Sequence, residues 1–324
     1  MRRPHGRGIL IILGCLLFLL PVFGIPVKAY RIRKVGTSPN FIALSPDGSK
    51  IYATSYGTNQ LLGIDLSKKM VTQSVEVGSA PLGLAIESQG KTAIVACKDS
   101  GTVTFVDLEA FRVIADLKVG GQPNSVAISP RGYSAYVSSY GRTREGSLSI
   151  IDVQDRSLTA TIKMGIAPVA IVVSPTTEMV FVVMGGNNEV WVVDPEKRMV
   201  VGKIAVGEAP DGIAITPDGR RIFVANSGTG DLSVIETQTM KVLITVPIGK
   251  TPFGVAVSND GKRVFVVNTT VRTVSILPAD LSSLDPETFD VDRGPTDIKV
   301  AHNNRTVYVV NELSNTIVVA ELPQ

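Results

Sequence analysis

Cysteine, histidine and tryptophan are scarce in this 324-residue chain, which has two cysteines, two histidines and one tryptophan. Beyond residue 29 only Cys97, His302 and Trp191 remain. A single cysteine excludes an intramolecular disulfide, and because Cys97 lies in an apolar run we expect it in the core. A single histidine excludes a His pair for a metal, and it argues against a Cys–His dyad or a ligand cluster for a haem iron.

Net charge and common catalytic motifs are also lacking. Residues 1–29 hold four basic residues and no acidic one, which leaves 28 basic and 29 acidic residues in the remainder. This balance gives no reason to expect a nucleic-acid partner, although Arg142 and Arg144 leave a local basic patch open. The chain has neither a Gly-x-Ser-x-Gly elbow nor a phosphate-binding P-loop. No metal or cofactor is therefore expected.

The first 29 residues have the pattern of a signal peptide. Three arginines occur among the first seven residues, and an apolar run follows from Ile9 to Leu20. Val27-Lys28-Ala29 places small residues at the −3 and −1 positions of a cleavage site, so the mature chain would begin at Tyr30. The run is short for a membrane span, although an uncleaved anchor and lipidation at Cys15 are left open. We expect a periplasmic or extracellular protein with no membrane span after cleavage.

A repeat of about 42 residues occupies the rest of the chain, residues 30–324. Prolines recur at intervals of 42, 42, 45, 42, 42 and 43 residues. They are Pro39, Pro81, Pro123, Pro168, Pro210, Pro252 and Pro295. A glycine lies three residues before each of the first six, and Asp292 takes that place before the seventh. Such a period indicates a repeat architecture of seven units.

Each unit reads as four short strands. In the first unit, residues 41–44, 51–55, 60–65 and 71–77 are apolar or alternating, and Ser45-Pro46-Asp47-Gly48 has the composition of a turn. No stretch has convincing helical periodicity with caps. Four strands per unit, repeated seven times, predict an all-β fold, a seven-bladed β-propeller of four-stranded antiparallel blades.

Three segments resemble the motif of the YVTN-repeat β-propeller family: residues 223–226 (FVAN), 265–268 (FVVN) and 308–311 (YVVN). Units 1 to 4 depart from the motif at the Asn position, where they carry Ser55, Cys97, Ser139 and Met184. The resemblance implies an exported binding, surface-layer or cell-envelope protein, and some members look like accessories to quinoprotein redox systems. A relative that binds DNA is known, a role that the balanced charge disfavours for this chain.

The ends of the chain are expected to meet in one blade. The last unit stops after its third strand, residues 316–321, whereas an extra strand, residues 30–35, precedes the first proline. We expect this N-terminal strand to close the seventh blade and give a monomeric ring. In the alignment of the repeats, Arg33 occupies a position of the outermost strand that is apolar in the other six units. We therefore expect the contact that closes the ring to be weak.

Candidate ligand-binding residues lie on the face that carries the blade-joining loops. Residues one and two places after each proline should ring the central channel, and among them we single out Asn40, Phe41, Asn124, Asp211, Phe253 and Asp297. Lys299 should point into the channel, where it needs a carboxylate or a ligand anion; pairing with Asp297 alone is the simpler alternative. Tyr56 and Tyr140 could offer stacking surfaces, and Arg142 and Arg144 lie in an insertion on this face.

The opposite face carries one irregular stretch in unit 6. It contains Asp280, Asp285, Glu287, Asp290 and Asp292. Clustered carboxylates suit calcium, but the spacing matches no calcium loop, so we expect a solvated acidic turn.

The leading hypothesis is an exported, non-catalytic propeller that binds a protein or a small molecule through its loop face. One alternative is a propeller enzyme, a lyase or lactonase-like hydrolase, that uses carboxylates at the channel mouth. Another is a structural surface-layer protein. The sequence does not identify the ligand or the partner.

Overall fold

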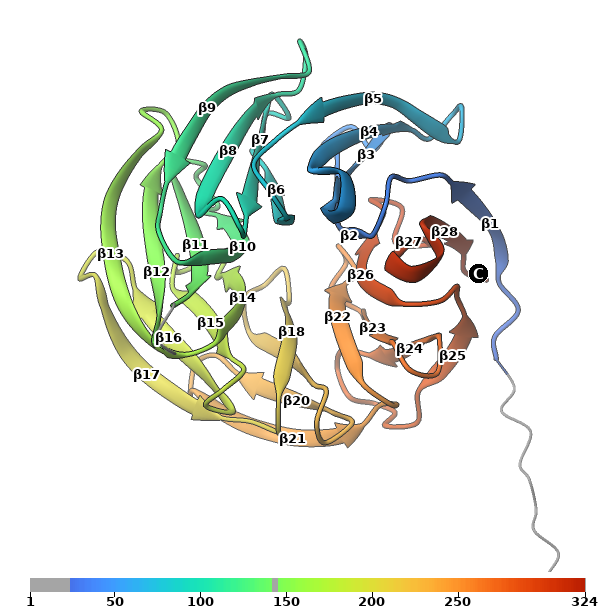
Figure 1. Cartoon of the computed structure of the whole chain (residues 1–324). Coiled ribbons are helices and arrows are strands. Elements are labelled where there is room, and N and C mark those ends of the chain that lie inside the picture. The colour runs from blue at the N-terminus through green and yellow to red at the C-terminus, as the bar shows by residue number, and fades with distance from the viewer. Residues whose placement is uncertain (1–23, 142–144, 324) are drawn as a thin grey trace, which may run out of the picture.

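The computed structural model describes residues 24–141 and 145–323 and forms a ring of seven blades (Figure 1). Each blade is one antiparallel sheet of four strands, and the innermost strand begins at or next to the repeating proline. The expected all-β, seven-bladed propeller is therefore confirmed. The predicted signal peptide falls largely on residues 1–23, which lie outside the described residues.

The first four blades contain sixteen strands, and in each blade the chain runs from the innermost strand outward. Blade 1 consists of β2 (Pro39–Leu44), β3 (Lys50–Ser55), β4 (Gln60–Asp65) and β5 (Met70–Glu76). Blade 2 consists of β6 (Pro81–Ile86), β7 (Thr92–Cys97), β8 (Thr102–Asp107) and β9 (Arg112–Lys118). Blade 3 consists of β10 (Gln122–Ile128), β11 (Ser134–Tyr140), β12 (Glu145–Asp152) and β13 (Ser157–Ile166). Blade 4 consists of β14 (Pro168–Val173), β15 (Val180–Met184), β16 (Glu189–Asp194) and β17 (Met199–Ala205).

The remaining three blades follow the same order, except that the outermost strand of the last blade comes from the start of the chain. Blade 5 consists of β18 (Pro210–Ile215), β19 (Arg221–Asn226), β20 (Asp231–Glu236) and β21 (Lys241–Pro247). Blade 6 consists of β22 (Pro252–Val257), β23 (Arg263–Asn268), β24 (Thr273–Pro278) and β25 (Glu287–Asp290). Blade 7 consists of β26 (Pro295–Val300), β27 (Thr306–Asn311), β28 (Thr316–Glu321) and β1 (Lys28–Arg33). Two short 3-10 turns, η1 (Tyr56–Thr58) and η2 (Glu312–Ser314), complete the described elements.

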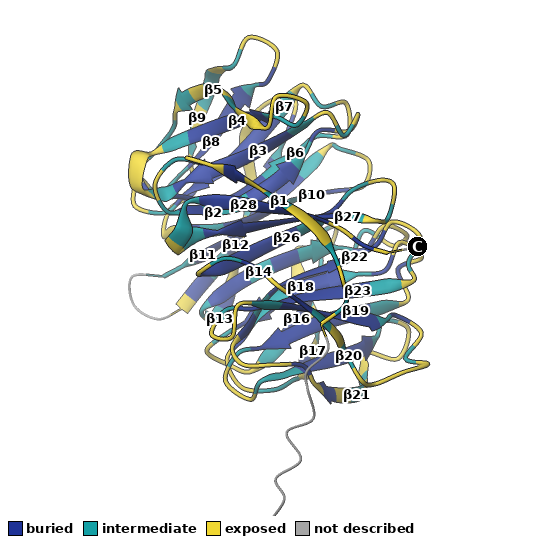
Figure 2. Ribbon diagram, turned by 90° about the vertical axis from the view of Figure 1, so that its right-hand side faces the viewer, coloured by how far each residue is buried: buried dark blue, intermediate teal, exposed yellow. Residues whose placement is uncertain are grey.

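The core lies between neighbouring blades rather than within one. Buried apolar side chains form seven clusters among the described residues, and each cluster joins strands of two adjacent blades. Figure 2 shows this burial in the middle of the strands, with exposure at the loops. Because both faces of a blade are covered by its neighbours, the inner strands are continuous apolar runs.

The tight turns between the first and second strands explain one of the repeated motifs. In Ser45-Pro46-Asp47-Gly48 the Asp47 carboxylate accepts hydrogen bonds from the Ser45 hydroxyl at 2.6 Å and from the Ser49 amide at 3.0 Å. These hydrogen bonds hold the pKa of Asp47 at about 2, and Gly48 supplies the positive φ of 69° that the turn requires. The equivalent residues of blades 5 and 6, Asp218 and Asp260, each accept hydrogen bonds from a hydroxyl and from a backbone amide in the same way.

The ring closes between β1 and β28, as expected from the chain ends. Pairing is antiparallel, with Ile32 opposite Ile317 and Arg33 opposite Thr316. The expected apolar slot is therefore filled by Ile32, which is fully buried, and Arg33 is exposed. The prediction that Arg33 occupies this slot was wrong by one residue, and such a shift moves a side chain to the other face of the sheet. The strand also begins at Lys28, two residues before the expected mature N-terminus.

Candidate functional site

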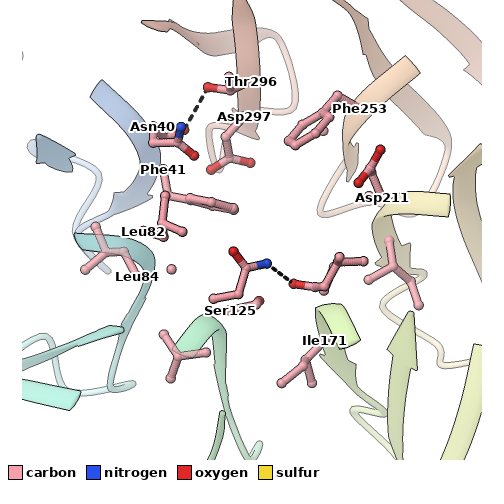
Figure 3. A pocket seen from close by; sticks show the side chains of 18 of the residues that line it. Asn40, Phe41, Leu82, Leu84, Ser125, Ile171, Asp211, Phe253, Thr296 and Asp297 are labelled. Atoms are coloured by element: carbon pink, nitrogen blue, oxygen red, sulfur yellow. Dashed lines mark hydrogen bonds between the residues drawn. The ribbon is translucent and has the colours of Figure 1, made fainter. Parts of the chain in front are cut away.

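A cavity of about 490 Å³ lies at the mouth of the central channel (Figure 3). The two residues that follow the proline of each innermost strand all line it, so every blade contributes to one rim. Its volume is within the range of small-molecule sites in proteins. The rim combines aliphatic and aromatic side chains with a few polar groups, which is the composition expected of a binding pocket.

Hydrogen bonds between blades hold this rim in place. Thr296 donates its hydroxyl to the carbonyl of Asn40 at 2.8 Å, joining blades 7 and 1 (Figure 3). The side-chain amide of Asn124 donates to the carbonyl of Val169 at 2.6 Å, joining blades 3 and 4. These bonds fix the rim polar groups to the scaffold, so the cavity is pre-formed.

In three blades the next innermost strand comes so close that only a glycine fits at the second rim position: Gly83, Gly212 and Gly254. A Cβ built on Gly212 would collide with the backbone carbonyl of Phe253 on the next blade. A β-bulge follows the proline in this strand, between Pro210 and Gly212. A bulge changes the direction in which the following side chains point. The wall below the rim consists of residues three places after the proline in five blades: Leu84, Val126, Ile171, Ile213 and Val255.

Lys299 and Asp297 form an ion pair in the wall of the cavity. The Lys299 ammonium lies 2.8 Å from each carboxylate oxygen of Asp297, and one of these oxygens also accepts the Ile42 amide at 3.0 Å. Asp297 is only 5% exposed. The pairing that the sequence offered as the simpler alternative is the one observed, and it neutralises the lysine charge.

Asp211 differs from Asp297 because no cationic side chain within ion-pair distance accompanies it among the described residues. It is half-buried at the rim of blade 5, and burial raises the pKa of its carboxyl, an effect that the Ser227 hydroxyl partly offsets. Tyr140, at the end of β11, has its pKa raised to about 12, mainly by burial and then by the charge of Asp211. The two groups therefore share a partly desolvated region of low polarity.

Most of the candidates from the sequence meet in this cavity. Those that line it are Asn40, Phe41, Asn124, Tyr140, Asp211, Phe253, Asp297 and Lys299. Tyr56 does not line the cavity. It lies in η1, and its backbone amide donates to the carbonyl of Ser38 at 3.1 Å. Arg142 and Arg144 lie outside the described residues. The part that these eleven residues play in binding stays a prediction.

Sequence reasoning missed the aliphatic wall below the rim. The signal for it was available only indirectly, in the glycine or small residue that follows the proline by two positions in most units. That pattern accompanies the bulge, but it does not predict which of the following side chains points toward the axis of the central channel.

The acidic stretch of unit 6 does not stay on one face. Asp292 lies beyond β25, in the loop that joins blades 6 and 7, and pairs there with Arg31 at 2.7 Å. Its expected place in a turn of the opposite face was wrong, because β25 carries the chain across the blade between Asp285 and Asp292. Within residues 24–141 and 145–323, no three His, Cys, Asp or Glu side chains come together as a metal site.

Comparison with known proteins identifies the family. Residues 53–259 match the family model described as Cytochrome D1 heme domain, and since this covers more than half of the chain, the protein belongs to that family. The fold is similar to that of hydrazine synthase from Kuenenia stuttgartiensis, with a TM-score of 0.80 and 23% sequence identity over 88% of this chain and 95% of that one. No curated protein matches the sequence. These findings support the seven-bladed propeller, but not the finer likeness to YVTN-repeat proteins.

The family name raises the question of whether the cavity fits a haem. Protein ligands to haem iron are histidine, cysteine, methionine or tyrosine, and Tyr140 is the one such residue among those that line the cavity. Its raised pKa disfavours the phenolate that would bind iron. His302 lies in the turn between β26 and β27, where its Nε2 is 2.9 Å from the carbonyl oxygen of Pro46, and Cys97 is fully buried in β7. The residues that line this cavity therefore do not supply a fitting axial ligand for a haem.

Proposed function

We propose that this protein is an exported, non-catalytic binding module whose channel mouth takes an organic cation with an apolar or aromatic body. The observation that carries the proposal is the charge of the cavity. Asp297 and Lys299 neutralise each other at 2.8 Å, whereas Asp211 has no cationic partner within ion-pair distance among the described residues. When ionised, Asp211 leaves the cavity with an uncompensated negative charge.

The groups around Asp211 favour a cation with an apolar body over a hydrated ion. Phe253, on the next blade, lies beside Asp211 at the rim, and Phe41 projects into the cavity from blade 1 (Figure 3). Aromatic faces attract ammonium and guanidinium groups and also cover apolar surface. A carboxylate on one side and rings on the other would hold the charge and the body of one ligand.

Such a ligand can be a free amine or a basic side chain of a protein partner inserted into the mouth. We place the protein in the periplasm or outside the cell, on the basis of the signal-like residues 1–29. No helix among the described residues is long and apolar enough to cross a membrane. The FVAN, FVVN and YVVN segments support the finer proposal that the chain is also related to the YVTN-repeat propellers, with an envelope or accessory role.

A second candidate, a lyase or lactonase-like hydrolase, is favoured by one specific observation. Burial raises the pKa of Asp211, and a carboxyl with a raised pKa in a cleft is suited to act as a general acid or base. An enzyme of this kind would lose turnover in an Asp211→Asn variant that still folds.

Calorimetry with three probes of one shape tests the proposal: 2-phenylethylamine, its neutral counterpart 2-phenylethanol, and phenylacetate. We expect the amine to bind and the anion not to bind, with the alcohol at least about tenfold weaker than the amine. Asp211→Asn should remove the preference for the amine. Asp155→Asn, an exposed carboxylate in the turn after β12, is the matched control and should keep it.

Equal binding of the three probes, or an unchanged preference in Asp211→Asn, would overturn the proposal. Hydrolysis of a panel of lactones by the wild-type protein that disappears in Asp211→Asn would replace it with the enzyme.

A further inference from the structure

Four arginines surround a second cavity, which lies at the seam where β1 closes the ring. The cavity has a volume of about 360 Å³. Its lining consists of Arg31, Arg33, Arg272, Val291, Asp292, Arg293, Ser314 and Thr316. Nothing in the proposed function uses this site, which lies between blades 6 and 7 and away from the channel mouth.

The four arginines of this seam cavity come from three separate segments of the chain. Arg31 and Arg33 lie on β1, Arg272 lies in the loop between β23 and β24, and Arg293 lies in the loop between β25 and β26. Figure 1 shows β1 beside β28 and close to β25, and Figure 2 shows β1 in the foreground of the ring wall. Closure of the ring therefore brings the arginines together.

The positive charge of the seam cavity is largely uncompensated. Asp292 is its one carboxylate; its Oδ1 accepts from Arg31 Nε at 2.7 Å and its Oδ2 accepts from the Thr316 hydroxyl at 2.8 Å. Within the described part of the chain, Arg33, Arg272 and Arg293 form no ion pair and no side-chain hydrogen bond. Like charges held near one another repel, so folding alone gives no reason to collect them at this point.

Comparison of the repeats shows that two of these residues break local rules of the propeller. Arg272 has a positive φ of 59° at a position where the other described loops of this kind carry Asn or Gly. Those residues are Asn59, Gly101, Asn188, Gly230 and Asn315. Asn and Gly tolerate this conformation, whereas arginine does so at a cost in free energy. Backbone strain of this kind is often retained where a side chain has a function.

The second break is Asp292, which replaces the glycine found at the same point in the six other blade-joining loops. In four of the other loops a Cβ there would collide with a side chain at the end of the second strand, for example with Ser55 at Gly36. In this loop the chain instead presents a carboxylate that holds Arg31 by its Nε and leaves the rest of that guanidinium available. The orientation of one arginine is thereby fixed while the three others are left for a ligand.

We infer that the seam cavity binds a small polyvalent oxyanion, of the phosphate-ester or pyrophosphate class. Guanidinium groups pair with phosphate oxygens through two parallel N–H donors, and several of them around one cavity neutralise a multiply charged group. The volume admits a small anion, and the site comprises one local cluster on a ring whose overall charge is balanced. These features favour a small anion over duplex DNA, which requires an extended basic surface.

Calorimetry with inorganic pyrophosphate and inorganic phosphate at low salt tests the inference on the purified protein. We expect one pyrophosphate per chain, bound more tightly than phosphate and weakened by added salt. Arg272→Asn should weaken pyrophosphate binding by about tenfold or more, as expected for the loss of one charge-assisted contact. Because asparagine suits the local backbone, this variant should fold at least as well as the wild type.

Arg198→Asn is the matched control, because Arg198 is also an exposed arginine with positive φ, at 56°, in a turn of the opposite face. Its affinity for pyrophosphate should equal that of the wild type. A parallel titration with adenosine monophosphate reports whether the cavity binds a phosphate ester as well as the free anion. The inference is overturned if pyrophosphate does not bind, if both variants lose affinity equally, or if a duplex oligonucleotide binds while pyrophosphate does not.

Discussion

Ile32 lies directly opposite Ile317 in the antiparallel pair of β1 and β28, so residues from the two ends of the sequence share one apolar cluster. Both side chains are fully buried, and they pack with Ile42 of the first blade. The β1–β28 pairing completes blade 7, and the packing of its side chains against Ile42 joins blade 7 to blade 1. An open propeller would leave sheet edges and apolar faces exposed at this point.

Ile32→Ala should therefore destabilise the whole protein. Removing a fully buried isoleucine side chain leaves a cavity, and we expect a loss of about 2–5 kcal/mol in the free energy of unfolding, measured by urea denaturation. Arg33→Ala, one residue along the same strand and exposed, should change it by no more than about 0.5 kcal/mol. A larger effect for Arg33 than for Ile32 would show that the register of the seam is wrong.

The contribution of Asp211 to stability should fall as the pH rises through the titration of its carboxyl. Because burial raises the pKa of this carboxyl in the folded state, the folded protein binds its proton more tightly than the unfolded chain does. The stabilising contribution is fully present below the unfolded pKa and is lost as the pH rises through the folded pKa. Hydrogen-bonded carboxylates with a lowered pKa, such as Asp47, contribute the opposite trend. The quantity to measure is therefore the melting temperature of the wild type minus that of Asp211→Asn, which should fall as the pH rises across the acidic range.

Asp155→Asn serves again as the control, and the difference in melting temperature between it and the wild type should not fall in this way with rising pH. If the profile of Asp211→Asn also matched that of the wild type, Asp211 would not be the group responsible.

Cys97 should be inert to thiol reagents in the folded protein. Its side chain is fully buried, and desolvation raises the pKa of the thiol to about 11, so almost no thiolate forms near neutral pH. An aromatic disulfide reagent should react slowly with native protein and rapidly in denaturant. Ser88→Cys places a thiol at an exposed site in the turn after β6 and should react fast without denaturant. Rapid reaction of native Cys97 would contradict its burial.

Much of the candidate site could be predicted from the repeat. Once the prolines were aligned, residues one and two places later had to lie at equivalent points of each blade, and the structure places all of them on the rim of the channel mouth. The partner of Lys299 was also open to prediction, because alternate residues of one strand project to the same face. The aliphatic wall was not, since the bulge after each proline changes which later residue faces the axis.

The amino-acid sequence by itself determined the number of blades, the order of strands and the place where the ring closes, because a fixed period and its turn residues act locally. Only the tertiary structure decided the register of the closing strand, where a shift of one residue exchanges buried Ile32 with exposed Arg33. It alone gathered Arg31, Arg272 and Arg293 around one cavity. Contacts between such distant residues depend on how their segments meet once the ring has closed, and no local pattern of residues encodes this.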